Sequence, residues 1–392
     1  AGGSPVEQVV LQSVRDSWFT FRGKDSQTSD DFRLHNWREM ELNDYLYAGG
    51  EVTKLWLYPR GPDSGFKVYP GFGKRHCYFN TTPITHALGK PCYVVRPFPP
   101  GAAPAPNGLP VFRLYYENDD DPQRRFGSDS RLGFTAPEDG EYLVRVSDVR
   151  GFGAAEGYGY TLLVRNSDPR FTVSVGGKDP KLVPGTGKLL TFTANREDGF
   201  AGQIEIRIDG VPDGYRVASP VVIEAGQLRA FGTFYAEENA PQLSEEESGA
   251  IRVTARARVA DEERVLELGD LGKVELGGEA KLKVSVAPAD EELTEVVIRP
   301  GETVYAVARV ERLGFGGRVE FGRDDSGKSL PHGVYVDNIG LNGLMIVEGQ
   351  SERQFAITAA PWVRPREGWL VLDTGADGGR SSAPMAIRVA AE

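Results

Sequence analysis

Short apolar or alternating runs, separated by turn residues, recur along the chain and predict strands rather than helices. Residues 111–116, 141–146 and 158–164 have the period-two or apolar pattern of half-buried strands. Nearer the N-terminus, residues 42–46 and 52–58 predict a hairpin whose turn contains Ala48-Gly49-Gly50. Residues 6–14 fit either a first strand or a short helix.

Prolines crowd residues 97–110, at positions 97, 99, 100, 104, 106 and 110. Because proline has no backbone N–H and a fixed φ, this run is neither a helix nor a central strand. We expect an extended crossing over the surface of the first domain, since strand-like runs of one pattern lie on both sides. A domain boundary near residue 100 is the alternative.

From residue 170 onward the chain contains the same unit twice. Residues 190–206 and 304–321 both run from a strand through a Gly-Phe-x-Gly turn into a second strand. Residues 210–217 then match 330–336, and residues 223–227 match 346–350. This offset is the length of a whole domain, and short strands between frequent turns are typical of immunoglobulin-like (Ig-like) sandwiches. Residues 243–248 and 260–278 are predicted as exposed hairpins inserted in the first copy, and residues 288–292 as a linker.

An acidic loop follows the strand predicted at 111–116. Its oxygen-bearing side chains are Glu117, Asn118, Asp119, Asp120, Asp121 and, further on, Asp129. These carboxylates repel one another unless a cation lies among them, and Ca²⁺ accepts six to eight oxygen ligands without strict geometry. The sequence therefore predicts Ca²⁺ ligands at Asn118, Asp119, Asp120, Asp121 and Asp129, with Glu117 as a further candidate. A solvated acidic loop is the alternative.

Four short motifs follow one another around this loop. They are Asn118-Asp119-Asp120, Phe134-Thr135-Ala136-Pro137, Asp139-Gly140-Glu141-Tyr142 and Gly157-Tyr158-Gly159-Tyr160. In this order they resemble the bacterial pre-peptidase C-terminal (PPC) domain, in the form found in large secreted proteins of planctomycete-type bacteria. The resemblance implies a small, jelly-roll-like, non-catalytic β-sandwich, some relatives of which bind calcium or polymeric ligands.

Composition narrows the class of protein. A net charge of −11, without a block of lysine and arginine, argues against nucleic acid and against anionic lipid as partners. The 48 glycines and 26 prolines among 392 residues suit many short strands joined by turns. No run approaches the roughly 20 apolar residues that cross a bilayer, so we expect no membrane insertion.

The two cysteines, Cys77 and Cys92, each begin a strand-like run and could face each other across neighbouring strands. A bridge would close a loop of about 15 residues and stabilise the domain by roughly 3 kcal/mol. Exported proteins permit such a bridge. Two free, buried cysteines are the alternative.

No pattern typical of a catalytic centre stands out. Ser64 lies only twelve residues before His76, Pro62 interrupts the glycine-rich surround of this serine, and there is no Gly-x-Ser-x-Gly motif. The histidines, at positions 35, 76, 86 and 332, lack the spacing of zinc ligands. A pair of carboxylates for glycoside hydrolysis stays open, because any acidic chain supplies one.

We therefore expect an all-β protein of tandem β-sandwiches: a PPC-like sandwich over residues 1–166, then Ig-like sandwiches over 167–288 and 289–392. Its expected role is non-catalytic, as a calcium-stabilised rod of sandwiches that contacts a surface polysaccharide or a protein partner. The expected location is extracellular or periplasmic. Two alternatives stay open: the accessory C-terminal region of a secreted hydrolase, or a subunit of a cell-envelope assembly or larger polypeptide.

Overall fold

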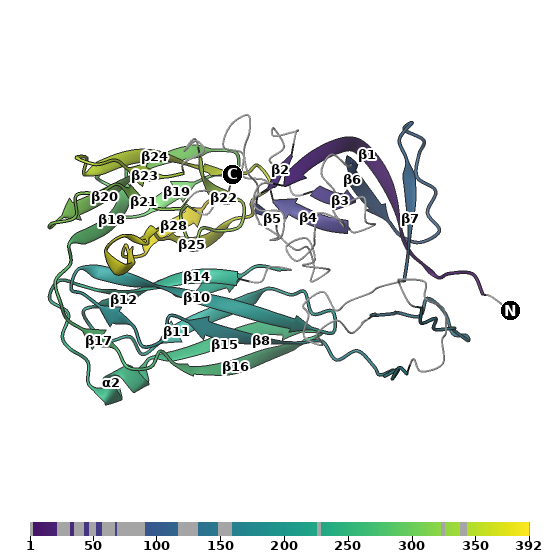
Figure 1. The fold of residues 1–392 in the computed structure, drawn as a ribbon, viewed down its shortest axis with the longest axis horizontal. Helices are drawn as coiled ribbons and strands as arrows, with labels where there is room; N and C mark the ends of the chain where they lie inside the picture. Colours follow the sequence, from purple (N-terminus) through teal and green to yellow (C-terminus); the bar gives the residue numbers. More distant parts are fainter. Residues whose placement is uncertain are drawn as a thin grey trace.

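The computed structural model describes residues 3–21, 32–34, 43–46, 52–56, 67–68, 91–116, 132–147, 159–225, 229–322, 326–337 and 343–391 (Figure 1). For the strand residues between 15 and 92 only the backbone is described. The all-β prediction is confirmed: the described elements are strands, apart from one α-helix and one 3₁₀ turn.

The N-terminal strands form one sheet with the order β2-β1-β6-β3-β4-β5, and β7 also pairs with β1. Its strands are β1 (Glu7–Phe21), β2 (Phe32–Leu34), β3 (Asn43–Leu46), β4 (Val52–Trp56), β5 (Lys67–Val68), β6 (Pro91–Phe98) and β7 (Val111–Tyr115). Of residues 6–14, which fitted a strand or a helix, all but Val6 fall in the long strand β1. The predicted hairpin is confirmed, since β3 pairs antiparallel with β4. The PPC-type arrangement stays a prediction.

The proline-rich crossing is confirmed for residues 99–110, whereas Pro97 and Phe98, at its predicted start, form the end of β6 and pair with β1. Residues 99–110 form neither strand nor helix and run along β1, to which they are hydrogen-bonded. The Asn107 side-chain amide donates to the Ser13 carbonyl over 2.8 Å, and the Ser13 N–H donates to the Pro110 carbonyl over 2.9 Å. The crossing therefore covers backbone groups of β1 that no strand reaches.

Two of the predicted strands are wrong. Residues 141–147 and 159–169 are in no strand and pair with no strand of the described chain, and residue 158 lies outside the described residues. Leu143 is 71% exposed and Leu163 is 79% exposed. Alternation predicts a half-buried strand only where a neighbouring backbone accepts its hydrogen bonds, and the described residues supply no such neighbour here.

The first Ig-like sandwich has two main sheets, with the orders β12-β14-β10-β27-β26 (β8 also pairs with β10) and β13-β11-β15-β16. Its strands are β8 (Arg170–Gly176), β9 (Lys181–Leu182), β10 (Thr186–Glu197), β11 (Ile204–Asp209), β12 (Tyr215–Val217), β13 (Val221–Ile223), β14 (Arg229–Ala236), β15 (Arg252–Val259), β16 (Glu262–Asp270) and β17 (Glu275–Leu276). Alternate residues of β10 and β11 point inward, so Phe192 and Ile206 are fully buried between the sheets.

The second Ig-like sandwich pairs the sheets β18-β20-β24-β22 and β19-β28-β25, with a short β21-β23 pair. Its strands are β18 (Leu282–Pro288), β19 (Val296–Ile298), β20 (Thr303–Arg312), β21 (Val319–Glu320), β22 (Val334–Asp337), β23 (Met345–Ile346), β24 (Glu352–Ala359), β25 (Arg366–Leu370) and β28 (Met385–Val389). Between β25 and β28 the chain forms β26 (Asp373–Thr374) and β27 (Arg380–Ser381), which join the sheet of the first sandwich. A 3₁₀ turn, η2 (Ala376–Gly378), lies between β26 and β27. Strand β18 pairs with β20, so residues 282–288 belong to this sandwich rather than to the one before the predicted boundary at 288. The division into three domains otherwise stays a prediction.

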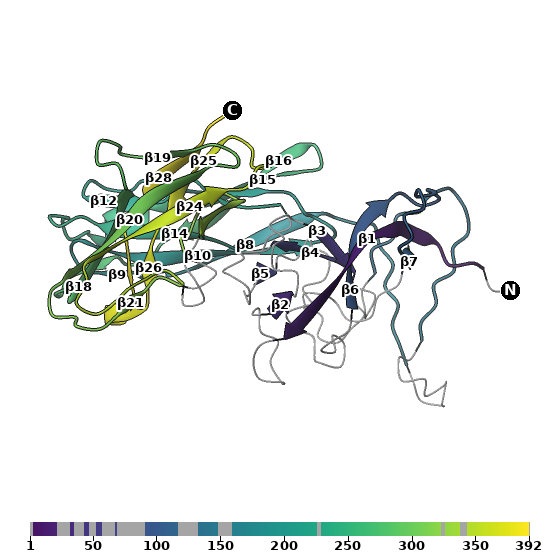
Figure 2. The ribbon, with the colours of Figure 1, turned by 90° about the horizontal axis from the view of Figure 1, so that it is seen from above.

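The two sandwiches lie side by side, not end to end as the predicted rod required (Figures 1 and 2). The second sandwich, green to yellow, lies along the teal first sandwich, and β27 is hydrogen-bonded to β10. The chain therefore turns back on itself between the two copies. In an end-to-end rod of sandwiches, β10 would not have β27 as a neighbour.

Both copies contain the same arginine clamp, which supports the predicted repeat. Arg196 donates hydrogen bonds to the carbonyls of Gly202 and Glu224. Its counterpart Arg312 donates to Gly317 over 2.6 Å and to Val347 over 3.0 Å. The acceptors occupy equivalent positions in the two copies. Gly202 and Gly317 are each the last glycine of the Gly-Phe-x-Gly turn, and Glu224 and Val347 each follow the isoleucine that begins a matched segment.

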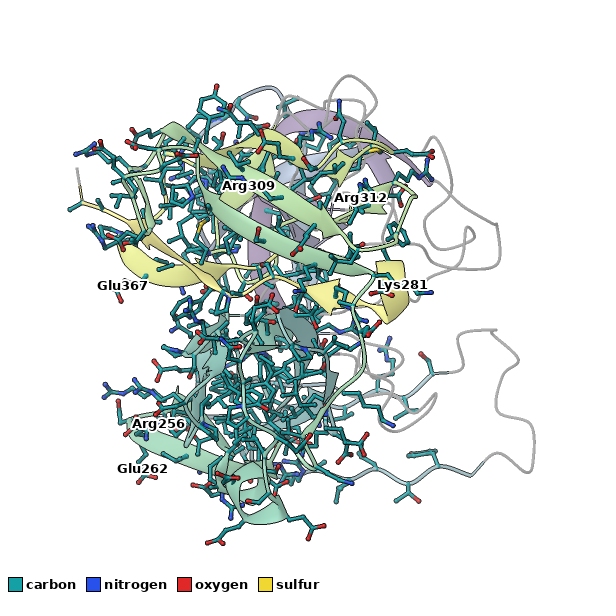
Figure 3. The ribbon with its side chains drawn as sticks, turned by 90° about the vertical axis from the view of Figure 1, so that its left-hand side faces the viewer. Arg256, Glu262, Lys281, Arg309, Arg312 and Glu367 are labelled. Atoms are coloured by element: carbon teal, nitrogen blue, oxygen red, sulfur yellow. The ribbon has the colours of Figure 1, made fainter. Side chains whose placement is uncertain are left out.

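The clamps differ in burial. Arg196 is 3% exposed and lies over the Phe200 ring at 5.2 Å, and burial lowers its pKa to about 10. Arg312 is half-buried near the surface of the second sandwich, where Figure 3 labels it. An equivalent arginine is therefore hydrogen-bonded to the Gly-Phe-x-Gly turn in both copies, buried in the first copy and near solvent in the second.

Residues 243–248, predicted as an exposed hairpin, instead begin the helix α2 (Glu245–Ala250). Ser244 accepts a hydrogen bond from the Glu247 N–H, and the Glu247 carboxylate accepts one from the Ser244 N–H over 2.8 Å. This reciprocal pair is a capping box, which favours a helix start over a turn.

Candidate functional site

The predicted Ca²⁺ ligands lie outside the described residues. All six of them fall between residues 117 and 131: Glu117, Asn118, Asp119, Asp120, Asp121 and Asp129. The calcium site therefore stays a prediction. Among the residues that the structure describes, no three His, Cys, Asp or Glu side chains are grouped so as to hold a metal ion.

The predicted disulfide stays a prediction as well, because Cys77 is outside the described residues and Cys92 is described by its backbone alone, in β6. Three of the four histidines also lie outside. None of the described helices is long and apolar enough to cross a membrane.

Within the described residues, the two Ig-like sandwiches contact each other through a set of polar and apolar groups around Gly187, Ser381 and residues 369–372. We call this contact region the joint. At its centre, Ser381 of β27 pairs with Gly187 of β10, and β26 pairs with β27. Strand β8 occupies the same side of β10 only from Thr191 onward. The hairpin β26–β27 therefore continues the sheet where β8 ends.

Gly187 permits this close approach. A Cβ atom there would lie 2.6 Å from the Ser381 Oγ and 2.8 Å from the Thr233 Oγ1. These two hydroxyls are fully buried and share a hydrogen bond of 2.6 Å. The buried hydroxyl pair of Thr233 and Ser381 therefore fits beside β10 only because Gly187 has no side chain.

One strand segment is shared by the two cores. Leu370 and Leu372 belong to the core of the second sandwich, whereas Val371 belongs to the core of the first, and all three are fully buried. Trp369 packs against the first core and donates from its indole N–H to the Pro220 carbonyl over 3.0 Å. Because alternate residues of a strand face opposite sides, residues 369–372 contribute to both cores at once.

Polar contacts surround this apolar centre. Lys188 donates to the carbonyls of Gly378 and Gly379 over 2.6 and 2.8 Å, and the Ser329 hydroxyl donates to the Phe231 carbonyl. Lys283 forms a 2.6 Å ion pair with Glu238. Each contact joins one copy to the other.

Three ionisable groups meet at one side of the joint. Arg366 of the second sandwich forms a 2.6 Å ion pair with Glu224 of the first. Burial raises the pKa of Glu224, although Arg366 opposes the shift. Burial, and then the charge of Arg366, lower the pKa of His332 to about 4, so this imidazole is neutral at pH 7. His332 also packs against Trp362, with ring centroids 5.4 Å apart.

The segment that leads from the N-terminal domain into the first Ig-like sandwich, residues 165–168, is also held by hydrogen bonds and an ion pair. Arg165 forms an ion pair with Asp198, and the Asp168 N–H donates to the same carboxylate over 2.9 Å. The Ser167 hydroxyl donates to the Asp198 carbonyl over 2.9 Å, and the Asp198 side chain is 3% exposed. Residues 165–168 are therefore tied to the Gly-Phe-x-Gly turn of the first sandwich.

None of the predictions made from the sequence includes the joint. The run Trp369-Leu370-Val371-Leu372 was the available signal, since a short, uninterrupted apolar run is typical of a strand that is buried on both faces. Gly187 and Ser381 carried no local signal, because 194 positions separate them.

Comparison with known proteins gives no family for the chain: no family model and no curated protein matches it. Among solved structures, a protein of unknown function from Porphyromonas gingivalis W83 is 13% identical, with 57% of this chain and 99% of that chain covered and a TM-score of 0.20. Domains 5–6 of the S-layer protein SbsC are 13% identical (57% and 98% covered, TM-score 0.20). The D00-D0 domain of intimin is 12% identical (55% and 99% covered, TM-score 0.19). Likenesses at this level do not indicate a shared function.

Proposed function

We propose that the chain is a non-catalytic structural module of an exported protein. In this proposal the two Ig-like sandwiches act as one rigid body that holds the N-terminal domain in place for contact with a surface polysaccharide or a protein partner. The supporting observation is the shared segment 369–372, whose side chains enter both cores.

Domains that follow one another in a chain ordinarily move, because their interfaces are small and polar. Here a relative rotation of the two sandwiches would pull Val371 out of the first core and separate β27 from β10. Both events expose fully buried groups. A stiff body is what a load-bearing or spacing element needs, and the contacts at Asp198 extend this stiffness to the entry of the N-terminal domain.

Single-molecule pulling of the full chain by its two ends tests the proposal. If Arg170 to Val389 unfold together, one step releases about 75 nm of chain, taking about 3.3–3.6 Å for each residue. Two separate steps of about half that length would contradict a single rigid body. Labelling of cells whose outer membrane has been opened, with a reagent that does not cross the inner membrane, tests export, and a chain that is labelled only after lysis of the inner membrane would contradict it.

We propose further that Asn118, Asp119, Asp120, Asp121 and Asp129 bind Ca²⁺, with Glu117 as an additional ligand. A bound cation would remove the mutual repulsion of these carboxylates and hold the loop in one conformation for a partner. The sequence of the loop supports this.

Calorimetric titration of CaCl₂ into the chelator-treated full chain tests the calcium proposal. We expect saturable heat and a higher melting temperature, both lost in Asp119→Asn/Asp121→Asn. The control is Glu138→Gln/Asp139→Asn, which removes two exposed carboxylates of the same domain. Absence of heat and of any shift in melting would exclude the site.

A further inference from the structure

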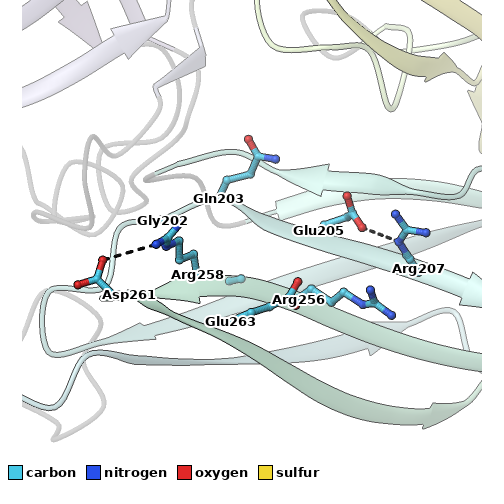
Figure 4. Close-up of a pocket in the computed structure, with 9 residues that line it drawn as sticks. Gly202, Gln203, Glu205, Arg207, Arg256, Arg258, Asp261 and Glu263 are labelled. Atoms are coloured by element: carbon cyan, nitrogen blue, oxygen red, sulfur yellow. Dashed lines mark hydrogen bonds and ion pairs between the residues drawn. The ribbon is translucent and has the colours of Figure 1, made fainter.

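The outer face of the sheet β13-β11-β15-β16 holds an open groove of about 740 Å³. Its lining includes Glu205 and Arg207 of β11 and Arg256 and Arg258 of β15 (Figure 4). These side chains point outward because their neighbours in sequence are buried, namely Ile204, Ile206 and Ile208 on β11 and Ala255, Ala257 and Val259 on β15.

Two of the three arginines of the groove are paired within it. Arg207 donates to Glu205 over 2.5 Å, and Arg258 lies 3.6 Å from Asp261, as the dashed lines of Figure 4 show. Both pairs are solvent-exposed, and Asp261 is fully exposed. Pairs of this kind contribute little to stability and exchange readily with other partners.

Arg256 is different. Within the described part of the chain its Nε is buried and has no hydrogen-bond acceptor, and its guanidinium has no carboxylate partner. Glu205 lies opposite Arg256 in the strand register, but its carboxylate is held by Arg207. A buried donor without an acceptor is unfavourable. Because the Arg256 Nε has almost no accessible surface, an incoming acceptor satisfies it only when the side chain turns outward.

The surroundings of Arg256 define the chemistry of the acceptor. The planar guanidinium fork matches a carboxylate, which can accept two parallel hydrogen bonds. Glu205, Asp261 and Glu263 line the same groove, so a densely charged polyanion is repelled whereas a single carboxylate is tolerated. In the register of the sheet, Arg256 stands between Glu205 and Val265, and Val222 lies beyond Glu205. Val265 is 47% exposed, so the arginine has an apolar side chain next to it.

We propose that Arg256 anchors a docking site for a protein partner that presents one carboxylate, from Asp or Glu, next to a small apolar side chain. An arginine beside an exposed aliphatic side chain, here Val265, is typical of an interface hot spot, where the charge is paired only after the partner has excluded water. The residues that line the groove include no aromatic ring on which a sugar could stack, which favours a protein over a polysaccharide.

Nuclear magnetic resonance of the arginine Nε–Hε groups in the full chain tests this site. The probe is the capped peptide acetyl-Val-Asp-Val-amide, and the isosteric control is acetyl-Val-Asn-Val-amide. We expect the aspartate peptide to shift the Arg256 Hε signal, assigned by its loss in Arg256→Gln, with a Kd of about 1–10 mM for so small a contact. The asparagine peptide should leave it unchanged, and the Hε signal of Arg264 on β16 should not move with either peptide.

The outcomes are distinct. No saturable shift at 30 mM peptide, or equal shifts with both peptides, would overturn the proposal. A larger shift with oligogalacturonate than with the aspartate peptide would replace the protein partner by an acidic polysaccharide.

A stability measurement separates docking from an architectural role. If Arg256 is retained for binding, Arg256→Met leaves the melting temperature unchanged or raises it by up to about 3 °C, because an unsatisfied buried donor is removed. A fall of several degrees would show that Arg256 supports the fold and would overturn the proposal.

Discussion

Gly187→Ala tests whether the joint depends on the close approach of β27 to β10. The new methyl group would lie 2.6 Å from the Ser381 Oγ, 2.8 Å from the Thr233 Oγ1 and 3.1 Å from the Ser381 carbonyl oxygen. Either β27 moves away or the two buried hydroxyls rotate and lose their shared hydrogen bond. Backbone strain plays no part, because the φ of Gly187 is not positive.

The size of the effect follows from these contacts. Overpacking costs about 1–3 kcal/mol, and a buried hydroxyl without its partner costs about 1–3 kcal/mol. Replacing glycine by alanine returns about 0.4–1 kcal/mol by restricting the unfolded chain. We therefore expect Gly187→Ala to lower the free energy of unfolding by about 1–5 kcal/mol.

Urea denaturation of the full chain, followed by circular dichroism, gives this number. The matched control is Gly176→Ala in β8, where the nearest atoms of Thr191 lie 3.6 Å from the new methyl group. We expect that variant to be neutral or slightly stabilised. In a Ser381→Ala background the effect of Gly187→Ala should shrink, since the closest atom is gone. If Gly187→Ala and Gly176→Ala agree within about 0.5 kcal/mol, β27 is not held against β10 as described.

Three further predictions concern single side chains. Arg196→Met should lower the free energy of unfolding by about 2–4 kcal/mol, because two carbonyls lose a buried donor. Arg312→Met removes the same contacts nearer to solvent and should lower it by only about 1 kcal/mol. Equal losses for the two variants in urea denaturation would contradict the difference in burial. His332, which faces Arg366, has a pKa of about 4 in the folded chain and an ordinary pKa near 6.5 in the unfolded chain. Its contribution to the free energy of unfolding is therefore complete above pH 6.5 and is lost as the pH falls toward 4, by about 3 kcal/mol in all. His332→Gln should flatten the fall in urea midpoint between pH 7 and pH 4.5, and an unchanged pH dependence would refute the assignment. Ser244→Ala should speed amide hydrogen exchange in α2 by about fivefold, corresponding to a lost cap of about 1 kcal/mol, and Glu246→Gln, which removes no cap, should not.

Local signals in the sequence predicted the local structure well. The two Gly-Phe-x-Gly turns and the residues that follow them correctly placed the repeat, and the structure adds the arginine that closes each turn. The capping box at Ser244 and Glu247 was equally local, and a search for Ser-x-x-Glu would have replaced the predicted hairpin by a helix.

The arrangement of the sandwiches could not be predicted in the same way. It depends on Gly187 meeting Ser381 and on Val371 entering a core built mostly from residues before 275, and no periodic pattern encodes such distant pairs. The strands predicted at 141–146 and 158–164 show the converse: the alternating pattern is present, but a strand also needs a neighbour. The acidic loop stays with the predictions, since it lies outside the described residues.

Native-state hydrogen exchange of the full chain most directly tests whether the two sandwiches form one body. The amides to compare are Phe192 and Phe234 in the first core with Ile357 and Ile387 in the second, all in paired strands. A shared unit predicts that both pairs open with the same free energy and the same urea dependence. Opening free energies that differ by more than about 1 kcal/mol, with a smaller urea dependence for the less stable pair, would show two independent domains and contradict the account.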